Sequence, residues 1–558
     1  MTDVTAQSLK SHEGRATANS QSKALWTVSR ILLALALVVL VFYFVVYVAY
    51  AVNLIRFPFD YDQGEGFELV DVMMFSQGRW PYQDIEQYPF YGSIYPPLYH
   101  ILLVPFAWLF GAEYWYGRLF SFLTTLVTAA AIGYAVYREG GKTPAARLIA
   151  VLSGFAFLSS NIVYHIGPLF RQHIPMFMFE TLAIVVLARV NEVENTQRRR
   201  WLLLLGVGLL LAAGYTKQLA AFTAIAAFAF LFIRQPRRAV VWGLGFGLVT
   251  GAIFLLINLS TNGHWWTQTI TANVKDFLPD QAVGLFRLWF SLHGFLIVPA
   301  LLYVLYEVYF ARISIYSVWF VVVTLLNAMA AGTWGAGDSY YATSVAAMCI
   351  LSGIFAVRFL NRDWTFNPNF YTRLLIAPLR QLAPLAAALG LIFVPLVYLG
   401  YGRAVLHMPT TGAIFEPIAN VLKLQPNADN GFYDSAGRIT GAYADIGHFT
   451  TQADIDAGYR ILDYVRETDS RVLSEEAAFS LRDERDVITN PVVLYILDQV
   501  GAYDSSNLVG MIEQQEFGLV ILRAQFYPTP VNLALTAYYE PFETIVMNGF
   551  EYILKRPN

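Results

Sequence analysis

A short acidic stretch stands out in a chain that is 56% hydrophobic and only 14% charged. The segment from Phe59 to Pro97 carries seven carboxylates, and three of them, Asp60, Asp62 and Glu65, lie within DYDQGE, soon after a long apolar run. A carboxylate beside aromatic side chains can have a raised pKa and serve as a general base. We therefore predict that at least one of Asp60, Asp62 and Glu65 is catalytic, and the residues alone leave open which one.

The other readings of these carboxylates are structural or metal-binding. We expect Asp71, Asp84 and Glu86 to form a solvated, disordered surface. Asp60 and Asp62 also match a D-x-D metal pattern, but hard cations need more oxygen ligands than two carboxylates supply. We therefore expect no required cofactor, with a divalent metal at Asp60 and Asp62 as the alternative. The sequence has no P-loop and no Gly-rich dinucleotide motif, so nucleotide-dependent chemistry finds no support.

Three cations and several polar residues lie in later loops between apolar runs. Cations at membrane depth are energetically costly and usually pair with an anionic group, so we predict that Lys217, Arg171 and Lys275 bind a phosphate group. The alternative is that Lys217 extends its ammonium group to water. The same loops supply our candidates for substrate binding, although Trp and Tyr are also common at membrane interfaces. These candidates are Tyr95, Gln218, His173, Trp265, Asp338 and Tyr340.

The elements that position these residues are predicted to be membrane helices. A mean hydropathy of +0.48 over 558 residues indicates several spans, and the net charge of -3 argues against a nucleic-acid partner. The single cysteine, Cys349, excludes disulfides and Cys-ligated metal clusters. We expect about eleven spans, near 31–52, 115–137, 147–164, 173–190, 201–215, 218–233, 239–259, 288–310, 314–332, 339–357 and 382–401.

The apolar segment 97–111 is short, and we interpret it as a juxtamembrane or re-entrant helix. With the N-terminus in the cytoplasm, nearly every Arg-rich loop then falls inside, as the positive-inside rule requires. This orientation predicts an integral protein of the plasma membrane with residues 53–111 and the C-terminus outside the cytoplasm. A cleaved signal peptide is the rival interpretation of the first span, but its apolar run is too long for one.

Three regions follow from this topology. Residues 1–25 are predicted to be a disordered cytoplasmic tail, and residues 26–402 a transmembrane module with an acidic first external loop at 53–111. Residues 403–558 are predicted to be a small external α/β domain, with an amphipathic helix in DIDAGYRILDYVRE and strands in RVLSE, EFGLVILRA and EYILKRP. The predicted fold class is a polytopic α-helical membrane protein with a C-terminal external α/β domain.

The arrangement of first span, acidic external loop and the proline-rich return YPPLY resembles the GT-C glycosyltransferases. It is most similar to bacterial relatives of protein O-mannosyltransferases and lipid A aminoarabinose transferases. The resemblance is best over residues 55–120 and weaker at TKQ (216–218) and beyond. It implies transfer of a sugar, usually with inversion, from a polyprenyl-phosphate carrier to a lipid, glycan or protein acceptor on the external face.

The resemblance also carries site residues. The family's catalytic carboxylate lies in the first external loop and maps onto Asp60, Asp62 or Glu65, with Asp62 first because it begins the DE-like motif. Here the adjacent Asp-Glu pair is replaced by Asp62-Gln63-Gly64-Glu65, and Gln172-His173 stands where a second acidic residue is common. Membrane lipids are the other expected partners. The alternatives are a transporter or flippase of lipid-linked sugars and a non-catalytic subunit of an envelope complex.

Overall fold

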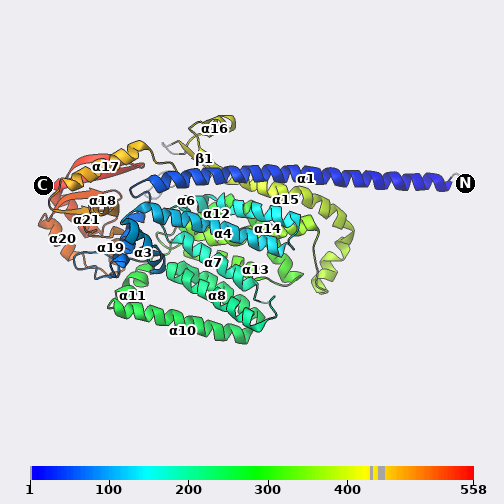
Figure 1. Ribbon diagram of the computed structural model, residues 1–558, viewed down its shortest axis with the longest axis horizontal. Coiled ribbons are helices and arrows are strands. Elements are labelled where there is room, and N and C mark those ends of the chain that lie inside the picture. The colour runs from blue at the N-terminus through cyan, green and yellow to red at the C-terminus, as the bar shows by residue number, and fades with distance from the viewer. Residues whose placement is uncertain (1–2, 191, 428–430, 438–446) are drawn as a thin grey trace.

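The protein is a helical body with a small α/β domain at one end (Figure 1). The computed structural model describes residues 3–190, 192–427, 431–437 and 447–558. The apolar stretches expected to span the membrane lie mainly in helices of this body, although the stretch 147–164 is not a single helix, because residues 159–160 interrupt it. These helices are α1 (Asp3–Arg56), α4 (Tyr114–Glu139), α5 (Pro144–Leu158), α7 (His173–Ala188), α8 (Thr196–Thr216), α9 (Ala221–Arg234), α10 (Pro236–Ser260), α12 (Pro279–Tyr309), α13 (Ile315–Ala330), α14 (Ala342–Asn361) and α15 (Ala383–Ala404). The predicted class of polytopic helical membrane protein is confirmed.

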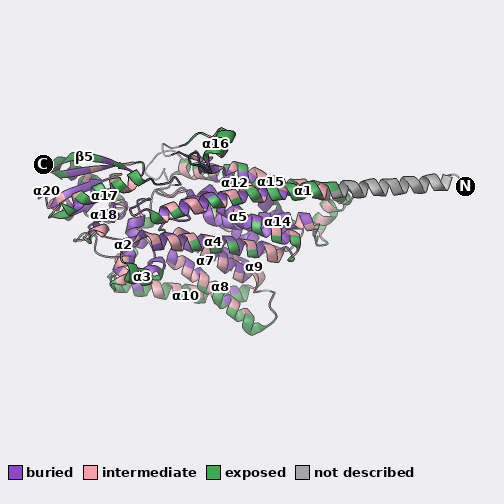
Figure 2. Ribbon diagram, turned by 45° about the horizontal axis from the view of Figure 1, so that its top comes forward, coloured by how far each residue is buried: buried purple, intermediate pink, exposed green. Residues whose placement is uncertain are grey.

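The helices differ in length. Within the described residues, six are long and apolar enough to cross a bilayer: they lie in α1, α4, α10, α12, α14 and α15. Shorter apolar helices, such as α5, α7 and α13, fill the interior between them. Helix α10 is the most peripheral of the long ones, since only 6% of its apolar window is buried (Figure 2). The number of true spans therefore stays a prediction.

Short helices cluster at the end of the body that carries the α/β domain. They are α2 (Glu65–Ser76), α3 (Leu98–Phe110), α6 (Asn161–Ile166), α11 (His264–Thr269) and the 3₁₀ turns η1 (Gln218–Ala220), η2 (Thr271–Asn273) and η3 (Asp338–Tyr341). Helix α3 rises only about 20 Å over its 13 residues, less than the ~30 Å of a hydrocarbon core. Its last turn exposes Trp108, Leu109 and Phe110, as expected of a juxtamembrane helix. A π turn η4 (Thr372–Ile376) and a 3₁₀ turn η5 (Pro378–Leu382) precede α15.

The N-terminal segment differs from the expectation. Helix α1 begins at Asp3, inside residues 1–25, which we expected to be a disordered tail, and its apolar span is Ala24–Arg56. Extending a helix that already exists adds one hydrogen bond per residue without the cost of nucleation, and Ala, Gln, Lys and Glu in this segment favour it. Residues 1–2 lie outside the described part of the chain.

The α/β domain contains the three strands and the amphipathic helix that the sequence predicted. Its sheet has the order β3-β4-β6-β5, with β3 and β4 parallel and the other pairs antiparallel. Strand β5 was not predicted. The elements of the α/β domain are α17 (Gln452–Arg466), β3 (Arg471–Ser474), α18 (Ala477–Arg482), α19 (Pro491–Gln499), α20 (Ser506–Glu513), β4 (Phe517–Leu522), α21 (Thr529–Tyr538), β5 (Tyr539–Met547) and β6 (Phe550–Pro557).

The connection between body and domain holds a short antiparallel pair and one helix. These are β1 (His407–Pro409), α16 (Glu416–Leu422) and β2 (Phe432–Asp434). The first external loop packs on the domain through Phe59, whose ring centroid lies 5.7 Å from that of Phe479 and 5.3 Å from that of Tyr459. One continuous hydrophobic core extends from the helical body into the sheet. The domain therefore lies directly over the acidic loop.

Candidate active site

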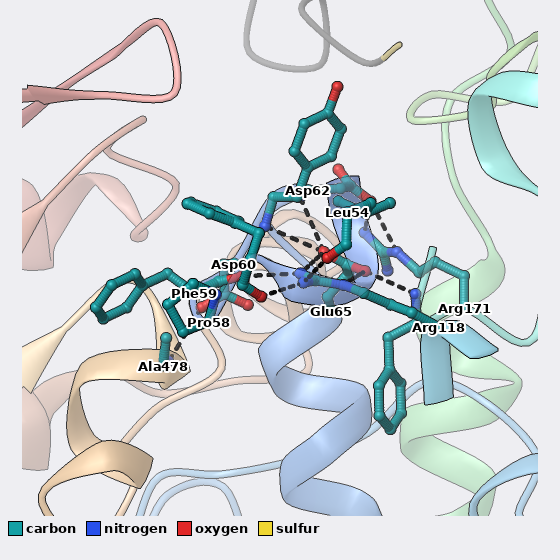
Figure 3. A network of polar contacts seen from close by, with 12 residues as sticks. Leu54, Pro58, Phe59, Asp60, Asp62, Glu65, Arg118, Arg171 and Ala478 are labelled. Carbon is teal, nitrogen blue, oxygen red and sulfur yellow. Dashed lines mark hydrogen bonds and ion pairs between the residues drawn. The ribbon is translucent and has the colours of Figure 1, made fainter. Parts of the chain in front are cut away.

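Glu65, at the start of α2, is the structural centre of the acidic loop (Figure 3). Arg118 of α4 donates to both of its oxygens, at 3.0 and 2.7 Å, and both side chains are fully buried. The backbone amides of Tyr61 and Phe170 also donate to the Glu65 carboxylate, at 3.0 and 2.6 Å. Arg118 donates in addition to the backbone oxygens of Leu54, Phe57 and Phe59. This pair fixes the loop to the body and leaves Glu65 no free oxygen for a substrate hydroxyl.

Asp62 has a different environment. Arg171, in the segment between α6 and α7, donates to Asp62 Oδ2 from Nε at 2.8 Å and from Nη2 at 2.5 Å (Figure 3). Asp62 Oδ1 accepts no hydrogen bond from any residue that the structure describes. Gly64 permits this arrangement, because a Cβ there would lie 2.1 Å from the Arg171 guanidinium. Asp62 is thus oriented by one oxygen and open at the other, which is what a general base requires.

Asp60 faces the external domain. Its Oδ2 accepts a hydrogen bond from the backbone amide of Ala478 at 3.0 Å (Figure 3). Burial raises the pKa of Asp60 to about 6. A Cβ on Gly66 would lie 2.5 Å from Asp60 Oδ1, so this glycine too is required by close approach. Asp60 and Asp62 thus turn one oxygen each to different partners, and the alternative of a metal at this pair stays a prediction.

The prediction for Asp71 is wrong. It is buried, and it accepts hydrogen bonds from Tyr91 at 2.8 Å and from Ser93 at 2.5 Å. Glu68 and Asp71, three residues apart on one face of α2, both turn toward His100 of α3, with Nε2–oxygen distances of 2.6 and 3.6 Å. Asp84 and Glu86 are exposed, as expected.

Glu68, Asp71 and His100 are the group within the described residues whose ligand atoms lie close enough together to hold a metal ion. They differ from the predicted pair, Asp60 and Asp62, although Arg171 contacts both Glu68, at 3.5 Å, and Asp62. Burial raises the pKa of Asp71 to about 6, and the neighbouring His100 opposes this rise. The sequence offered a weak signal for the group in the three-residue spacing of Glu68 and Asp71, but no signal for its partner on α3.

The predicted phosphate-binding cations converge beside Arg171. Lys217, between α8 and η1, contacts His173 Nε2, and its Nζ lies 5.2 Å from the ring centroid of Tyr95 and 5.7 Å from that of Tyr340. Burial, together with the positive charge of Arg171, holds the pKa of Lys217 well below its usual range. A desolvated cation beside other cations has few favourable partners in the protein. An anion bound here would supply one.

Lys275 lies at the edge of this cluster. Its Nζ is 5.7 Å from the ring centroid of Trp334, and burial lowers its pKa to about 8. The positive charge of Lys275 also lowers the pKa of Lys217. The structure thus brings together Lys217, Arg171, His173, Tyr95 and Tyr340, with Lys275 beside them, although they come from five separate loops. We call these six residues the cation cluster.

The remaining candidates have mainly structural contacts. Gln218 donates to the backbone oxygens of Ile94 at 2.8 Å and Thr269 at 3.4 Å, and so holds the YPPLY segment in place. Trp265 is buried, with its ring centroid 4.7 Å from that of Tyr82. Asp338 is buried at the start of η3, two residues before Tyr340. Gln218 and Trp265 thus help to position the loops, and the predicted contact of all three residues with substrate stays untested.

The external domain completes the loop's surroundings. Arg482 donates to the backbone oxygen of Pro58 at 3.1 Å and to both oxygens of Glu113. Asn548 donates to the backbone oxygen of Tyr61 at 3.0 Å. Next to Asp62, Gln63 is 2% exposed, yet neither amide atom has a hydrogen-bond partner among the described residues. The site therefore combines an oriented carboxylate, one buried side-chain amide without a described partner and a cluster of cations.

Part of the sequence matches a known family, and the whole fold is similar to solved structures. Residues 95–265 match the model of the family described as dolichyl-phosphate-mannose-protein mannosyltransferase. No curated protein sequence gives a significant match. The crystal structure of ArnT from Cupriavidus metallidurans in the apo state is similar over 96% of this chain and 98% of its own, with 14% identity and a TM-score of 0.54.

The structure of the same ArnT bound to undecaprenyl phosphate covers 95% of this chain and 98% of its own, with 14% identity and a TM-score of 0.55. The archaeal oligosaccharyltransferase AglB from Archaeoglobus fulgidus, in complex with an inhibitory peptide and a dolichol-phosphate, has 11% identity and a TM-score of 0.43, covering 92% of this chain and 74% of its own. The ArnT-like fold and the family match confirm the resemblance predicted from the sequence.

Proposed function

We propose that this chain, which has the GT-C glycosyltransferase fold, moves a sugar from a polyprenyl-phosphate carrier to an acceptor on the extracytoplasmic face of the plasma membrane. The observation that carries the proposal is the position of Asp62. One of its oxygens is held by Arg171, the other is open, and Arg171 also belongs to the cation cluster. A base and a phosphate site are thus joined by a single guanidinium group.

The donor phosphate would bind at the cation cluster. Arg171 and Lys217 would supply donors and positive charge, and a phosphate anion would favour the charged form of Lys217, whose pKa burial lowers. Undecaprenyl phosphate is the ligand of the similar ArnT structure, which supports a lipid phosphate as the carrier. A carrier of this kind needs no nucleotide-binding motif, in agreement with the sequence.

The reaction would use Asp62 as general base. Its free Oδ1 would accept the proton of an acceptor hydroxyl while the hydroxyl oxygen bonds to the anomeric carbon of the donor sugar. The bond from that carbon to the phosphate oxygen breaks on the opposite side, so the configuration inverts. The negative charge that develops on the leaving phosphate would be stabilised by Arg171 and Lys217.

The acceptor would approach from the side of the external domain. Gln63 stands beside the proposed base with an unused donor and an unused acceptor, which suits neighbouring hydroxyl groups of a sugar or hydroxylated lipid. Leaving a buried amide unpaired costs free energy, so a ligand that fills both positions gains it. We assign Gln63 to acceptor binding on this ground.

The alternatives have weaker support. A transporter of lipid-linked sugars would use ionisable groups within its spans, and Glu180 in α7 is one such residue. Its two oxygens accept hydrogen bonds from Thr223 at 2.6 Å and Thr343 at 2.7 Å, so the helices around it already satisfy it. A non-catalytic envelope subunit would not need an oriented carboxylate with an open oxygen beside a buried cation cluster.

The test is donor consumption by the purified protein. In lipid nanodiscs, the protein is given a panel of undecaprenyl-phosphate-linked sugars with acceptor extract, and release of undecaprenyl phosphate is followed. Asp62→Asn should lower the rate by about 10²–10⁴-fold, because an amide cannot take up the proton. Asp84→Asn, in the exposed part of the same loop, is the matched control and should keep wild-type turnover. Full activity of the Asp62 variant would refute the assignment.

A further inference from the structure

A groove lies between α4 and α5, away from the active site, and extends toward the end of the helical body opposite the external domain. Its volume is about 560 Å³. The two helices touch by their backbones here: a Cβ on Gly133 would lie 3.0 Å from the Ala150 oxygen, and one on Gly154 would lie 2.9 Å from the Ala129 oxygen. Small side chains on both helices therefore leave an apolar channel, lined by Ala129, Ala130, Gly133, Ala150, Val151, Gly154, Phe155 and Leu158.

The polar end of this groove is rich in cations. Arg147 lines the groove itself, and an adjoining hollow of about 640 Å³, which shares Tyr134 and Tyr137 with it, is lined by Arg138, Lys142, Arg189 and Glu192. Arg138 pairs with Glu192. Lys142, Arg147 and Arg189 make no ion pair with any residue that the structure describes. Four cations thus face one carboxylate, and three of them have no anionic partner.

We infer that this groove and its adjoining hollow bind an anionic phospholipid of the leaflet opposite the external domain. The phosphate would lie among Lys142, Arg147 and Arg189, and one acyl chain would follow the apolar channel. From Tyr137 to Ala129 the channel rises about 12 Å along α4, close to the ~15 Å of one leaflet's hydrocarbon. Basic pockets between membrane helices bind anionic headgroups, and the charge here is complementary to one.

This site is separate from the proposed donor site. The cation cluster lies beside Asp62, near the start of α4, whereas Arg147 lies in α5, just after the loop at the far end of α4. A structural lipid here would bridge α4 and α5, and α4 also carries Arg118, which holds the acidic loop. Lipid binding would therefore stabilise the fold without taking part in sugar transfer.

The test is a lipid titration of the full-length protein in detergent, followed by native mass spectrometry. Phosphatidylglycerol should bind more tightly than phosphatidylcholine. The pair of substitutions Lys142→Ala and Arg147→Ala should weaken phosphatidylglycerol binding about 25-fold, at about fivefold per cation near a membrane surface. Ala130→Phe fills the channel from an exposed position, keeps every charge and should also weaken binding.

The matched control removes the same charge from the start of another helix at the same end. Arg237 and Arg238 are exposed in the first turn of α10, and their replacement by Ala should leave phosphatidylglycerol affinity unchanged. Equal loss in the control pair and the test pair would show general surface attraction and overturn the site. Equal affinity for the two lipids in the wild-type protein, or unchanged binding in both the cation and the Ala130 variants, would also overturn it.

Discussion

Two carboxylates three residues apart, Asp62 and Glu65, should respond to amide substitution in opposite ways. Asp62→Asn should abolish most transfer and leave the protein folded. Glu65→Gln should unfold or loosen the acidic loop, and any loss of transfer should follow from that. The difference arises from their partners, since Arg118 and two backbone amides use up the oxygens of Glu65, whereas Asp62 keeps one oxygen free.

The magnitudes follow from burial. The Glu65–Arg118 pair is 0% exposed on both sides, and removing one member of such a pair costs about 3–5 kcal/mol because the other charge is left uncompensated. Asp62→Asn keeps an oxygen that can accept from Arg171, and Arg171 retains Glu68 at 3.5 Å. We therefore expect Asp62→Asn to cost about 1 kcal/mol of stability and about 10²–10⁴-fold in rate.

The assay measures both quantities on the same preparations. Unfolding in detergent is followed by tryptophan fluorescence against denaturant, and transfer by release of undecaprenyl phosphate. The stability control is Glu516→Gln, which breaks an ion pair with Arg471. The Glu516 side chain is 32% exposed and that of Arg471 is 49% exposed, so the loss should be under about 1 kcal/mol. The reasoning is refuted if Glu65→Gln is as stable as this control, or if Asp62→Asn destabilises the protein more than Glu65→Gln does.

Three further predictions concern donor binding, pH and topology. Lys217→Ala should weaken binding of undecaprenyl phosphate at least about tenfold. A bound phosphate should raise the low pKa of Lys217, so the affinity of the wild-type protein should fall as pH rises from the pKa of free Lys217 to its pKa with phosphate bound. Lys217→Arg should flatten that dependence. A pH-independent affinity in the wild-type protein would contradict this prediction. The pKa of Asp60 is raised from 3.8 to about 6, so its protonated form stabilises the fold below pH 3.8, and this stability is lost as pH rises through 6. Asp60→Asn should therefore be about 3 kcal/mol more stable than wild type at pH 7 and no more stable at pH 3.5. A reversed slope in pH-dependent unfolding would contradict this prediction. Cysteine at exposed Gln87 should react with an impermeant thiol reagent in intact cells and cysteine at exposed Thr196 should not, and the opposite pattern would reverse the orientation.

Much of the architecture was predictable because apolar length and alternation are local signals. The predicted strands in RVLSE, EFGLVILRA and EYILKRP appear as β3, β4 and β6, and DIDAGYRILDYVRE lies in α17. Strand β5 was missed, since Glu540, Pro541 and Glu543 break its hydrophobic pattern. Its place is determined by pairing with β6 along most of its length, which the local sequence does not reveal.

The cation cluster was predictable in membership but not in geometry. Lys217, Arg171 and His173 drew notice because charged or polar groups are rare at membrane depth. That they meet, and that Tyr95 and Tyr340 flank the same ammonium group, depends on how separate loops pack. No spacing in a single sequence encodes such contacts.

The carboxylates show the limit most clearly. Asp60, Asp62, Glu65 and Asp71 look alike in the sequence, yet each turns to a partner outside its own segment, and three of these partners lie far along the chain. Glu65 finds Arg118 on α4, Asp62 finds Arg171, and Asp60 finds an amide of the external domain 418 residues away. Asp71 was assigned to the surface because its partners, Tyr91, Ser93 and His100, come from the return segment and the next helix.

The acidic loop is held from two sides, and this division suggests how specificity is distributed. The helical body fixes it through Glu65 and Arg118, and the external domain contacts it through Ala478 and Asn548. A lipid-linked donor presents its phosphate at the membrane interface, where the cation cluster of the body lies, whereas an acceptor from the aqueous side meets the domain first. Donor choice should therefore depend on the body's loops and acceptor choice on residues 403–558. Since the proposed base, Asp62, lies between them, we expect that both must be in place before proton transfer from the acceptor hydroxyl.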